Sequence, residues 1–504
     1  MLKLAEKNRK WWILLAMSSS LALVFIDQTA LAVALPAIQR ELNLSNSLSQ
    51  WVINAYLLAL SAIILLGGKI GDRLGHKRAF LAGVIVFITA STLAALAESG
   101  AWLITARAIQ GIGAAFMMPS TNALVTNAFP AQERGKALGI YIALATIFLA
   151  LGPLLGGFLT QVFSWRAVFW INFPIALISI ILAISSVPTW RRREKLNIDY
   201  LGFFISVIFI SGFVLGFMEA PNWGWTSLPI MGLFLLSIIS LITFIGWEKK
   251  IPHPLVELTL FKNLTFATLF SVLLIVQAVA IVFVFLAIFL QNVLHYSPLM
   301  AGLLLLPAMV PIMLMAPVGG HLRDKYGPTL PMFCGALLVV LSLIWIAIFS
   351  HNRGYAWLFP GLLVYGIGMP LILSGIMATV MNMVNAQQRG MASAIFNCAR
   401  QFGNTIGLAL LTGLLASVNK WQLNSFLHHS PVPLSRLKEQ QIDGLLVQSD
   451  QAMKAIAHLS LAHIELLKTA ALNAYTNAFS MTLLAAAILA FLSLFLILKI
   501  PRKQ

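Results

Sequence analysis

Charged residues are scarce in this sequence. Only 10% of the 504 residues are Asp, Glu, Lys or Arg, whereas a soluble globular domain is about a quarter charged. Hydrophobic residues make up 60% of the chain. This small number of charged residues cannot cover a water-facing surface. An ordinary soluble domain is therefore excluded, and most of the exterior must face lipid.

Motifs for catalysis, metal binding and nucleotide binding are also missing. Lys69 follows Gly68, but the glycine that a phosphate-binding loop needs at position 63 is Ile, so ATP-driven transport is not expected. No Cys/His metal spacing and no nucleophile elbow occur. Cys334 and Cys398 both lie in apolar runs, and a structural disulfide is not expected. The sequence therefore predicts no enzyme, no metal site and no cofactor.

Long apolar runs dominate the chain. A membrane-spanning helix needs about 20 mostly apolar residues. Fourteen candidates satisfy this: 12–36, 51–68, 79–97, 101–123, 137–160, 167–187, 199–219, 228–247, 265–291, 299–320, 331–349, 355–380, 391–417 and 475–498. The first run is too long for a signal peptide, so we expect it to be retained as a span.

The basic residues orient these spans. If the N-terminus is cytoplasmic and the sides alternate, 23 of the 33 Lys and Arg residues lie on the cytoplasmic side, 8 lie on the other side, and Arg107 and Arg400 lie within spans. This asymmetry is typical of the positive-inside rule. The net charge of +17 therefore indicates membrane orientation and not nucleic-acid binding. We expect a multi-pass inner-membrane protein with both termini in the cytoplasm.

Two passages recur along the chain. Residues 68–75 resemble 320–327, shifted by 252, and residues 131–137 resemble 386–392, shifted by 255. The repeat predicts an all-α membrane protein with a six-helix bundle in 1–190, a two-helix insertion in 191–262 and a second six-helix bundle in 263–504, which includes an extracytoplasmic segment at 418–474. Duplicated halves with the substrate path between them are common in secondary transporters.

Asp27 stands out among the sixteen acidic residues, because it is the only one well inside an apolar run. An ionisable group at that depth is costly and functional by default, so we expect Asp27 to take up and release protons. The alternative is that it only links helices through a hydrogen bond. Arg107 lies at a matching depth, roughly 10–14 Å from the outer boundary. We expect it to pair with Asp27; otherwise it would bind backbone carbonyls.

Three further groups are candidates. The loop 67–78 has the glycines of a tight turn and could form a conformational latch, or could serve orientation alone; its residues are Gly68, Asp72, Arg73, Gly75 and Arg78, with Asp324 in the repeat. Span 5 carries small residues and a proline that allow bending and close packing: Gly152, Pro153, Gly156 and Gly157. Candidate substrate-cavity residues are Asn54, Tyr56, Gln110, Arg400 and Asn404.

Arg400 and the segment 418–474 each leave alternatives open. Arg400 lies about mid-membrane, where it could contact an anionic group on a substrate or lipid, or pair with helix carbonyls. In the segment, apolar residues recur near helical spacing, which indicates an amphipathic helix. That helix could lie on the outer leaflet, extend the last span, or dock an extracytoplasmic partner. These residues are Ile442, Leu446, Met453, Ile456, Ile464 and Leu467.

Several motifs together resemble a known family. They are GGKIGDRLGHKR at 67–78, LITARAIQGIG at 103–113, ALGPLLGG at 150–157, FIDQTALAVALP at 25–36, and PLVEL with FKN at 254–263. The chain resembles the major facilitator superfamily, and within it the fourteen-span drug:proton antiporters of the EmrB/QacA type. The resemblance implies two six-helix bundles that rock about a central cavity, with two inserted helices, and a proton-transfer role for the span 4 arginine, which is Arg107 here.

The resemblance also implies a function. Proton influx would drive export of small lipophilic drugs, and Gram-negative members work with a periplasmic adaptor and an outer-membrane channel. Relatives that export dications carry extra acids in later spans, and spans 9 to 14 have none here, so neutral, monovalent or weakly acidic lipophiles are expected. The alternatives are an exporter of an endogenous lipid, siderophore or metabolite, and a non-transporting membrane receptor or scaffold.

Overall fold

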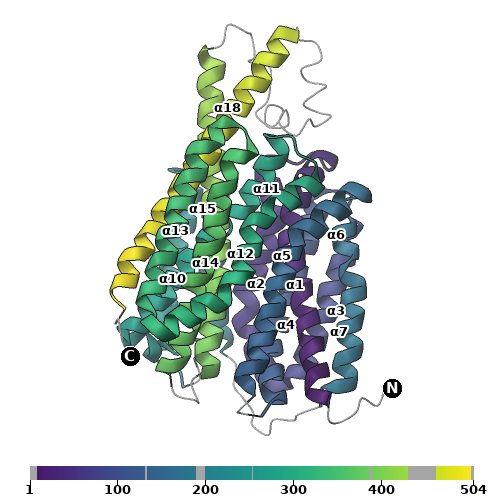
Figure 1. Ribbon diagram of the computed structural model, residues 1–504, viewed down its shortest axis with the longest axis vertical. Coiled ribbons are helices and arrows are strands. Elements are labelled where there is room, and N and C mark those ends of the chain that lie inside the picture. Colours follow the sequence, from purple (N-terminus) through teal and green to yellow (C-terminus); the bar gives the residue numbers. More distant parts are fainter. Residues whose placement is uncertain are drawn as a thin grey trace.

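A computed structural model describes residues 8–130, 133–188, 199–252, 254–384, 389–429 and 461–500, and these residues form a bundle of helices (Figure 1). The first half comprises α1 (Arg9–Glu41), α2 (Asn46–Leu74), α3 (His76–Ala95), α4 (Gly100–Ala128), α5 (Arg134–Val162), α6 (Ala167–Trp170) and α7 (Asn172–Ser186). The inserted pair is α8 (Tyr200–Trp223) and α9 (Leu228–Glu248). The second half comprises η2 (Leu258–Lys262), α10 (Leu264–Ala280), α11 (Val282–Asn292), α12 (Pro298–Tyr326), α13 (Thr329–Phe349), η3 (Ser350–Asn352), α14 (Tyr355–Met383), α15 (Arg389–His429) and α18 (Leu461–Leu498).

Each predicted span coincides with helical structure. Thirteen segments of the described chain are long and apolar enough to cross a membrane, and the described apolar part of α5 covers Ile147–Val162. Spans 6 and 9 each consist of two consecutive helices, α6 with α7 and α10 with α11. The helices run past the predicted ends, because hydropathy detects only the stretch that faces lipid and a helix continues into water when its own hydrogen bonds and packing support it.

The segment 418–474 shows this most clearly. The last span was expected from 475, but α18 begins at Leu461, and α15 continues to His429. Extension of span 14 is therefore confirmed for residues 461–474, where Leu467 is buried and Ile464 is partly buried. Both helices project beyond the other helices at one end of the molecule (Figure 1). Ile442, Leu446, Met453 and Ile456 lie outside the described residues.

The sequence repeat is reproduced in the ends of equivalent helices. Ser45 Oγ accepts a hydrogen bond from the Leu48 amide at the start of α2, and 252 residues later Ser297 Oγ accepts one from Met300 at the start of α12. A side-chain oxygen at this position satisfies an amide that the helix leaves unpaired. Gly75, which ends α2 with a φ of 95°, corresponds to Gly327 with a φ of 79°, a conformation that favours glycine.

The repeat also recurs in helix packing. A Cβ atom added to Gly111 of α4 would overlap the Tyr56 carbonyl of α2, and one added to Gly366 of α14 would overlap the Ala308 carbonyl of α12. The two glycines are 255 residues apart and the two carbonyls are 252 apart. Glycine lets helices approach closely in a membrane. The two halves therefore share one packing scheme, as the repeat predicts.

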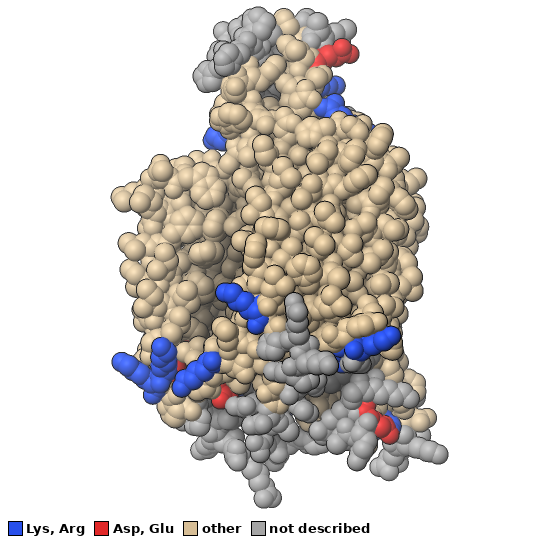
Figure 2. Space-filling model, turned by 60° about the vertical axis from the view of Figure 1, so that its left-hand side comes forward, with Lys and Arg blue, Asp and Glu red and all other residues tan. Residues whose placement is uncertain are grey.

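The surface divides into an uncharged belt and charged ends. Both chain termini lie at one end of the molecule, and Lys and Arg side chains gather near that end in the view of Figure 2. We call it the basic end; α15 and α18 project at the opposite end. The belt between them carries exposed apolar side chains such as Leu235 and Ile242 on α9. Such a surface fits a lipid bilayer.

The inserted pair lies against both halves. From α8, Glu219 Oε1 accepts a hydrogen bond of 3.0 Å from Trp51 Nε1 on α2. Trp225, just beyond α8, donates from Nε1 to Ser417 Oγ on α15 over 2.9 Å. The Phe209 ring packs edge-on against Phe402. The insertion therefore contacts one helix of each half, a position that sequence reasoning did not assign.

The close approach at Gly366 gives a stability prediction. Gly366→Val should lower the stability of the folded protein by about 1–3 kcal/mol, because the added methyl groups force α14 away from α12. The apparent melting temperature in detergent measures the change. The control is Gly232→Val on α9, where an added Cβ meets nothing within 4 Å. Equal melting temperatures for both variants would show that the contact is not tight.

Candidate functional site

An ion pair lies inside the first half. Arg107 Nη1 of α4 donates to Asp27 Oδ2 of α1 over 2.5 Å, and both side chains are 0% exposed. The two residues lie 80 positions apart and meet because their depths match, as the sequence suggested. Removing both charges from water is costly, so each charge depends on the other and on the polar groups around them.

Two amides complete the surroundings of the carboxylate. Gln110 Nε2 donates to Asp27 Oδ1 over 3.0 Å, and Asn172 Nδ2 of α7 donates to the same oxygen over 3.3 Å. Gln110 follows Arg107 by three residues, which places the two side chains on one face of α4. The carboxylate therefore accepts hydrogen bonds from two helices that pack against α1.

Arg107 has additional partners besides Asp27. Its Nε donates to the Val52 carbonyl of α2 over 3.0 Å, and its Nη1 also donates to Gln110 Oε1 over 2.6 Å. The guanidinium lies over the Tyr56 ring, 4.3 Å from the centroid, an attractive cation–π arrangement. Arg107 therefore pairs with Asp27 and also binds a backbone carbonyl, so both alternatives from the sequence analysis hold together. Arg107 can remain held when Asp27 is neutral.

Sequence reasoning missed Asn172 and Ser91. Asn172 Nδ2 also donates to Ser91 Oγ over 2.9 Å, and Ser91 Oγ donates to the Phe169 carbonyl over 2.9 Å. Both side chains are fully buried. The available signal was an Asn within the apolar run 167–187, but amides in spans are less conspicuous than charges.

The candidate cavity residues fall into two groups. Asn54, Tyr56 and Gln110 are 0% exposed, so none of them faces an open cavity in this conformation; Tyr56 and Gln110 contact the ion pair. Arg400 and Asn404 on α15 are partly exposed. The structure therefore separates a closed polar cluster in the first half from an accessible cation in the second half.

The residues of the predicted latch have varied surroundings. Gly75 makes the turn between α2 and α3, while Arg73 and Arg78 are exposed and Arg73 Nη1 lies 3.4 Å from the Tyr200 hydroxyl of α8. Gly68 has only the Pro119 side chain within ordinary contact of an added Cβ. The side chains of Asp72 and Asp324 lie outside the described part, so the latch remains a prediction.

The small residues of span 5 form two helix contacts. A Cβ on Gly152 would overlap Thr29 Oγ1, and one on Gly156 would overlap the Ala30 carbonyl. These two glycines press α5 against α1, within one turn of Asp27. On the other side, an added Cβ on Gly157 would overlap the Pro298 carbonyl, and one on Gly302 would overlap the Pro153 carbonyl. α5 therefore connects α1 to α12 of the second half.

The two halves are joined from mid-depth to the opposite end. Gln291 Nε2 of the second half donates to the Val33 carbonyl over 2.8 Å, and the Leu299 amide donates to Gln161 Oε1 over 3.2 Å. Near mid-depth, Ser61 and Thr405 share a hydrogen bond of 2.6 Å.

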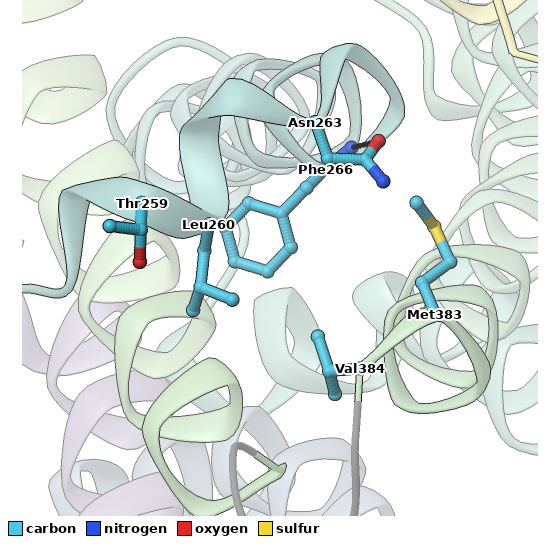
Figure 3. A pocket seen from close by; sticks show the side chains of 6 residues that line it. All are labelled: Thr259, Leu260, Asn263, Phe266, Met383 and Val384. Atoms are coloured by element: carbon cyan, nitrogen blue, oxygen red, sulfur yellow. Dashed lines mark hydrogen bonds between the residues drawn. The ribbon is translucent and has the colours of Figure 1, made fainter.

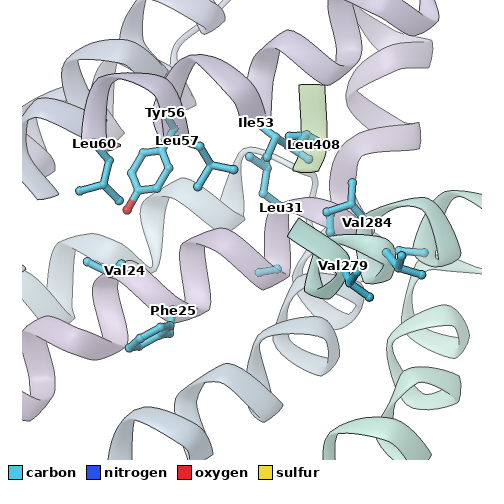
Figure 4. Close-up of a cluster of buried hydrophobic side chains, with 14 of the residues drawn as sticks. Val24, Phe25, Leu31, Ile53, Tyr56, Leu57, Leu60, Val279, Val284 and Leu408 are labelled. Carbon is cyan, nitrogen blue, oxygen red and sulfur yellow. The ribbon is translucent and has the colours of Figure 1, made fainter. Parts of the chain in front are cut away.

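Apolar side chains fill the same region. Leu31, Ile53, Val279, Val284 and Leu408, drawn from α1, α2, α10, α11 and α15, belong to one buried cluster (Figure 4). This cluster and the three polar contacts pack the two halves together from mid-depth toward the opposite end.

A pocket of about 250 Å³ lies elsewhere, between η2, the start of α10 and the end of α14 (Figure 3). Leu260, Phe266, Met383 and Val384 supply most of its lining, with Thr259 and Asn263. Asn263 already accepts hydrogen bonds from the first amides of α10. The described residues contain no group of three His, Cys, Asp or Glu that could hold a metal ion. The buried ion pair is therefore the candidate functional site among the described residues.

Comparisons with known proteins agree with this architecture. Residues 17–408 match the model of the Major Facilitator Superfamily. The chain is 33% identical to the multidrug resistance protein Stp of Mycobacterium tuberculosis, over 84% of this chain and 79% of that protein. It is 32% identical to the tetracenomycin C resistance and export protein of Streptomyces glaucescens, over 82% and 77%. Among solved structures, an inward-facing bacterial homolog of the human lysosomal transporter Spinster has a TM-score of 0.65 and 18% identity, over 99% and 98% of the two chains.

Asn172 can be tested separately from the charges. Asn172→Leu should lower transport several-fold, because Asp27 Oδ1 loses one of its donors, while the protein remains folded. The control is Ser179→Ala on the same helix, which removes an equally buried hydrogen bond to the Ala16 carbonyl of α1. Initial rates in vesicles, normalised to folded protein, give the comparison. Equal rates for the two variants would reduce Asn172 to a packing residue.

Proposed function

The chain belongs to the Major Facilitator Superfamily, and we propose that it exports small lipophilic drugs or toxic compounds in exchange for protons, by alternating access. The protein is a multi-pass membrane transporter and not an enzyme. The relatives that carry multidrug and tetracenomycin C resistance in their names support a drug as cargo. The main support for proton coupling is the fully buried ion pair of Asp27 and Arg107.

Protonation of Asp27 changes the balance of this cluster. A neutral Asp27 loses most of its attraction to Arg107, while Arg107 keeps Val52, Gln110 and the Tyr56 ring as partners. Helix α1 is then less tightly held to α4. Asp27 is 0% exposed in this conformation, so proton exchange with water requires the halves to move. The proposal therefore ties each protonation change to a conformational change.

A mechanical route leads from the carboxyl group to the second half. Thr29 and Ala30 follow Asp27 within one turn and lie against Gly152 and Gly156 of α5. On its other side α5 lies against α12. Such tight contacts do not deform continuously, so a shift of α1 displaces α5 and alters the seam between the bundles of 1–190 and 263–504.

The orientation and the energy source belong to the same proposal. Placing the basic end in the cytoplasm puts both termini inside and follows the positive-inside rule. In the inner membrane the proton gradient then runs inward and can drive export without a cofactor. The contacts that join the halves toward the opposite end close the outer side, so this conformation admits cargo from the cytoplasm.

Asp27→Asn tests coupling directly. The variant should fold, because the amide fills the same volume and can still accept hydrogen bonds, but drug-induced proton movement should fall by more than tenfold. The measurement is the internal pH of proteoliposomes on addition of a drug panel. Glu98→Gln, at an exposed acid, is the matched control. Undiminished proton movement in Asp27→Asn would refute the coupling role.

The cargo is the less constrained part of the proposal. A panel of lipophilic drugs, fatty acids and siderophores in the same proteoliposomes with an imposed pH gradient separates drug export from export of an endogenous metabolite. A receptor or scaffold would move none of them. A buried titratable acid has no evident use in a scaffold, which favours transport.

We further propose that segment 418–474 contacts a periplasmic adaptor, which would lead to an outer-membrane channel. The support is that α15 and α18 extend past the other helices on the side assigned as outer. A contact there can assist export from the cell without taking part in proton coupling.

Replacing residues 430–460 by a Gly/Ser linker tests this contact. Transport in isolated vesicles should stay within about twofold of wild type, because a flexible linker of the same length leaves the described helices α15 and α18 intact. Drug resistance of cells should fall clearly. An equal loss in both assays would indicate a folding role and remove the adaptor from the proposal.

A further inference from the structure

A second intramembrane arginine lies outside the ion-pair cluster. Arg400 is eleven residues after the start of α15, or about 16 Å along the helix axis. Its guanidinium lies over the Phe25 ring of α1, 5.3 Å from the centroid. Arg400 thus stands at the seam between the halves, and unlike the fully buried Arg107 it is partly exposed.

Arg400 has no counter-charge in the described part of the protein. Asp27, the acid deep in the first half, is already bonded to Arg107, Gln110 and Asn172. The spans of the second half contain no acidic residue within their apolar stretches. Among the described residues Arg400 forms no ion pair and no hydrogen bond; its cation–π contact with Phe25 leaves the N–H donors available. An uncompensated cation at this depth indicates a functional site.

The nearby groups do not compensate the charge either. Tyr141 of α5 is uncharged at neutral pH, and its hydroxyl shares a 2.5 Å hydrogen bond with Thr121. The other intramembrane arginine, Arg107, is fully buried and paired with Asp27, so it does not compete with Arg400 for an anion. Among the described residues, no backbone carbonyl accepts a hydrogen bond from Arg400, so the alternative that it pairs with helix carbonyls is not supported. An anion arriving at Arg400 would therefore meet a donor-rich group without a competing acid.

The location suits a lipophilic partner. Ser61 and Thr405 share a hydrogen bond across the seam between the halves. Thr405 lies just over one turn of α15 from Arg400, toward the opposite end. Arg400 lies beside this contact on the side of the basic end, where Gln401 Nε2 also lies 3.5 Å from Met118 Sδ of α4. Phe25 supplies an aromatic surface, and Asn404, one turn along α15 from Arg400, is partly exposed. A cation against aromatic and apolar surface matches a molecule with one anionic group and an apolar body.

We propose that Arg400 determines the charge class of the cargo: it binds the anionic group of lipophilic acids, such as a carboxylate or phenolate, and disfavours cations. This inference rests on the proposed export function and specifies its substrate. The anionic group that binds Arg400 could belong to an exogenous acid or to an anionic lipid. Competition between the two for binding distinguishes these sources. A bidentate guanidinium–carboxylate pair supplies the geometric preference.

The test is ligand binding by the purified full chain in detergent, without a gradient. The probes are 1-pyrenebutyrate and its uncharged amide, followed by fluorescence. Wild type should bind the acid at least tenfold more tightly than the amide. Arg400→Gln should abolish this preference and leave amide affinity within about twofold, whereas Arg400→Lys should retain part of it. Lys250→Gln, at an exposed lysine, should leave the preference unchanged.

The outcomes separate this inference from the export proposal. An acid preference that survives in Arg400→Gln, or an equal loss for acid and amide, overturns the role of Arg400. Competition by phosphatidylglycerol in wild type but not in Arg400→Gln would identify a lipid as the source of the anion and support the site. Retained acid preference with no proton-driven transport would refute export alone, because binding needs no gradient.

Discussion

The ion pair of Asp27 and Arg107 is the constraint on which the rest of the first half depends. Two charges inside a membrane protein are tolerable only together, and loss of one partner of a buried pair typically costs about 3–5 kcal/mol. Helix α4 brings Arg107 and Gln110, α7 brings Asn172, and α2 supplies a carbonyl and the Tyr56 ring. Four helices are therefore fixed around one carboxyl group. A change in its charge alters how all four are held.

The two halves share a scaffold but differ in chemistry. At the spacing that relates Gly111 to Gly366, the position of Arg107 corresponds to Leu362, which is buried. Equivalent helices thus pack alike, while the second half has an apolar residue where the first has a guanidinium. The buried ion pair lies in the first half, and Arg400 of the second half lies at the seam over the Phe25 ring. This asymmetry lets a duplicated fold handle protons and cargo at separate places.

The inserted helices add a constraint on motion between the halves. Helix α8 bonds to α2 through Glu219, and the chain just after it bonds to α15 through Trp225. Any rocking of α2 against α15 must slide past these contacts or carry α8 with one side. The insertion therefore has a structural reason to influence the rate of the conformational change, beyond adding two more spans.

The sequence by itself determined the order of the apolar spans, the repeat and the matching depths of Asp27 and Arg107. Length, hydropathy and the cost of a charge in lipid are local properties, so they can be read without a structure. Only the tertiary structure decided that Asn172 joins the pair, that Tyr56 and Gln110 lie against it, and that Arg400 has no counter-charge among the described residues. Those facts depend on which helices meet and how closely, and close packing between distant segments leaves no periodic trace in the chain.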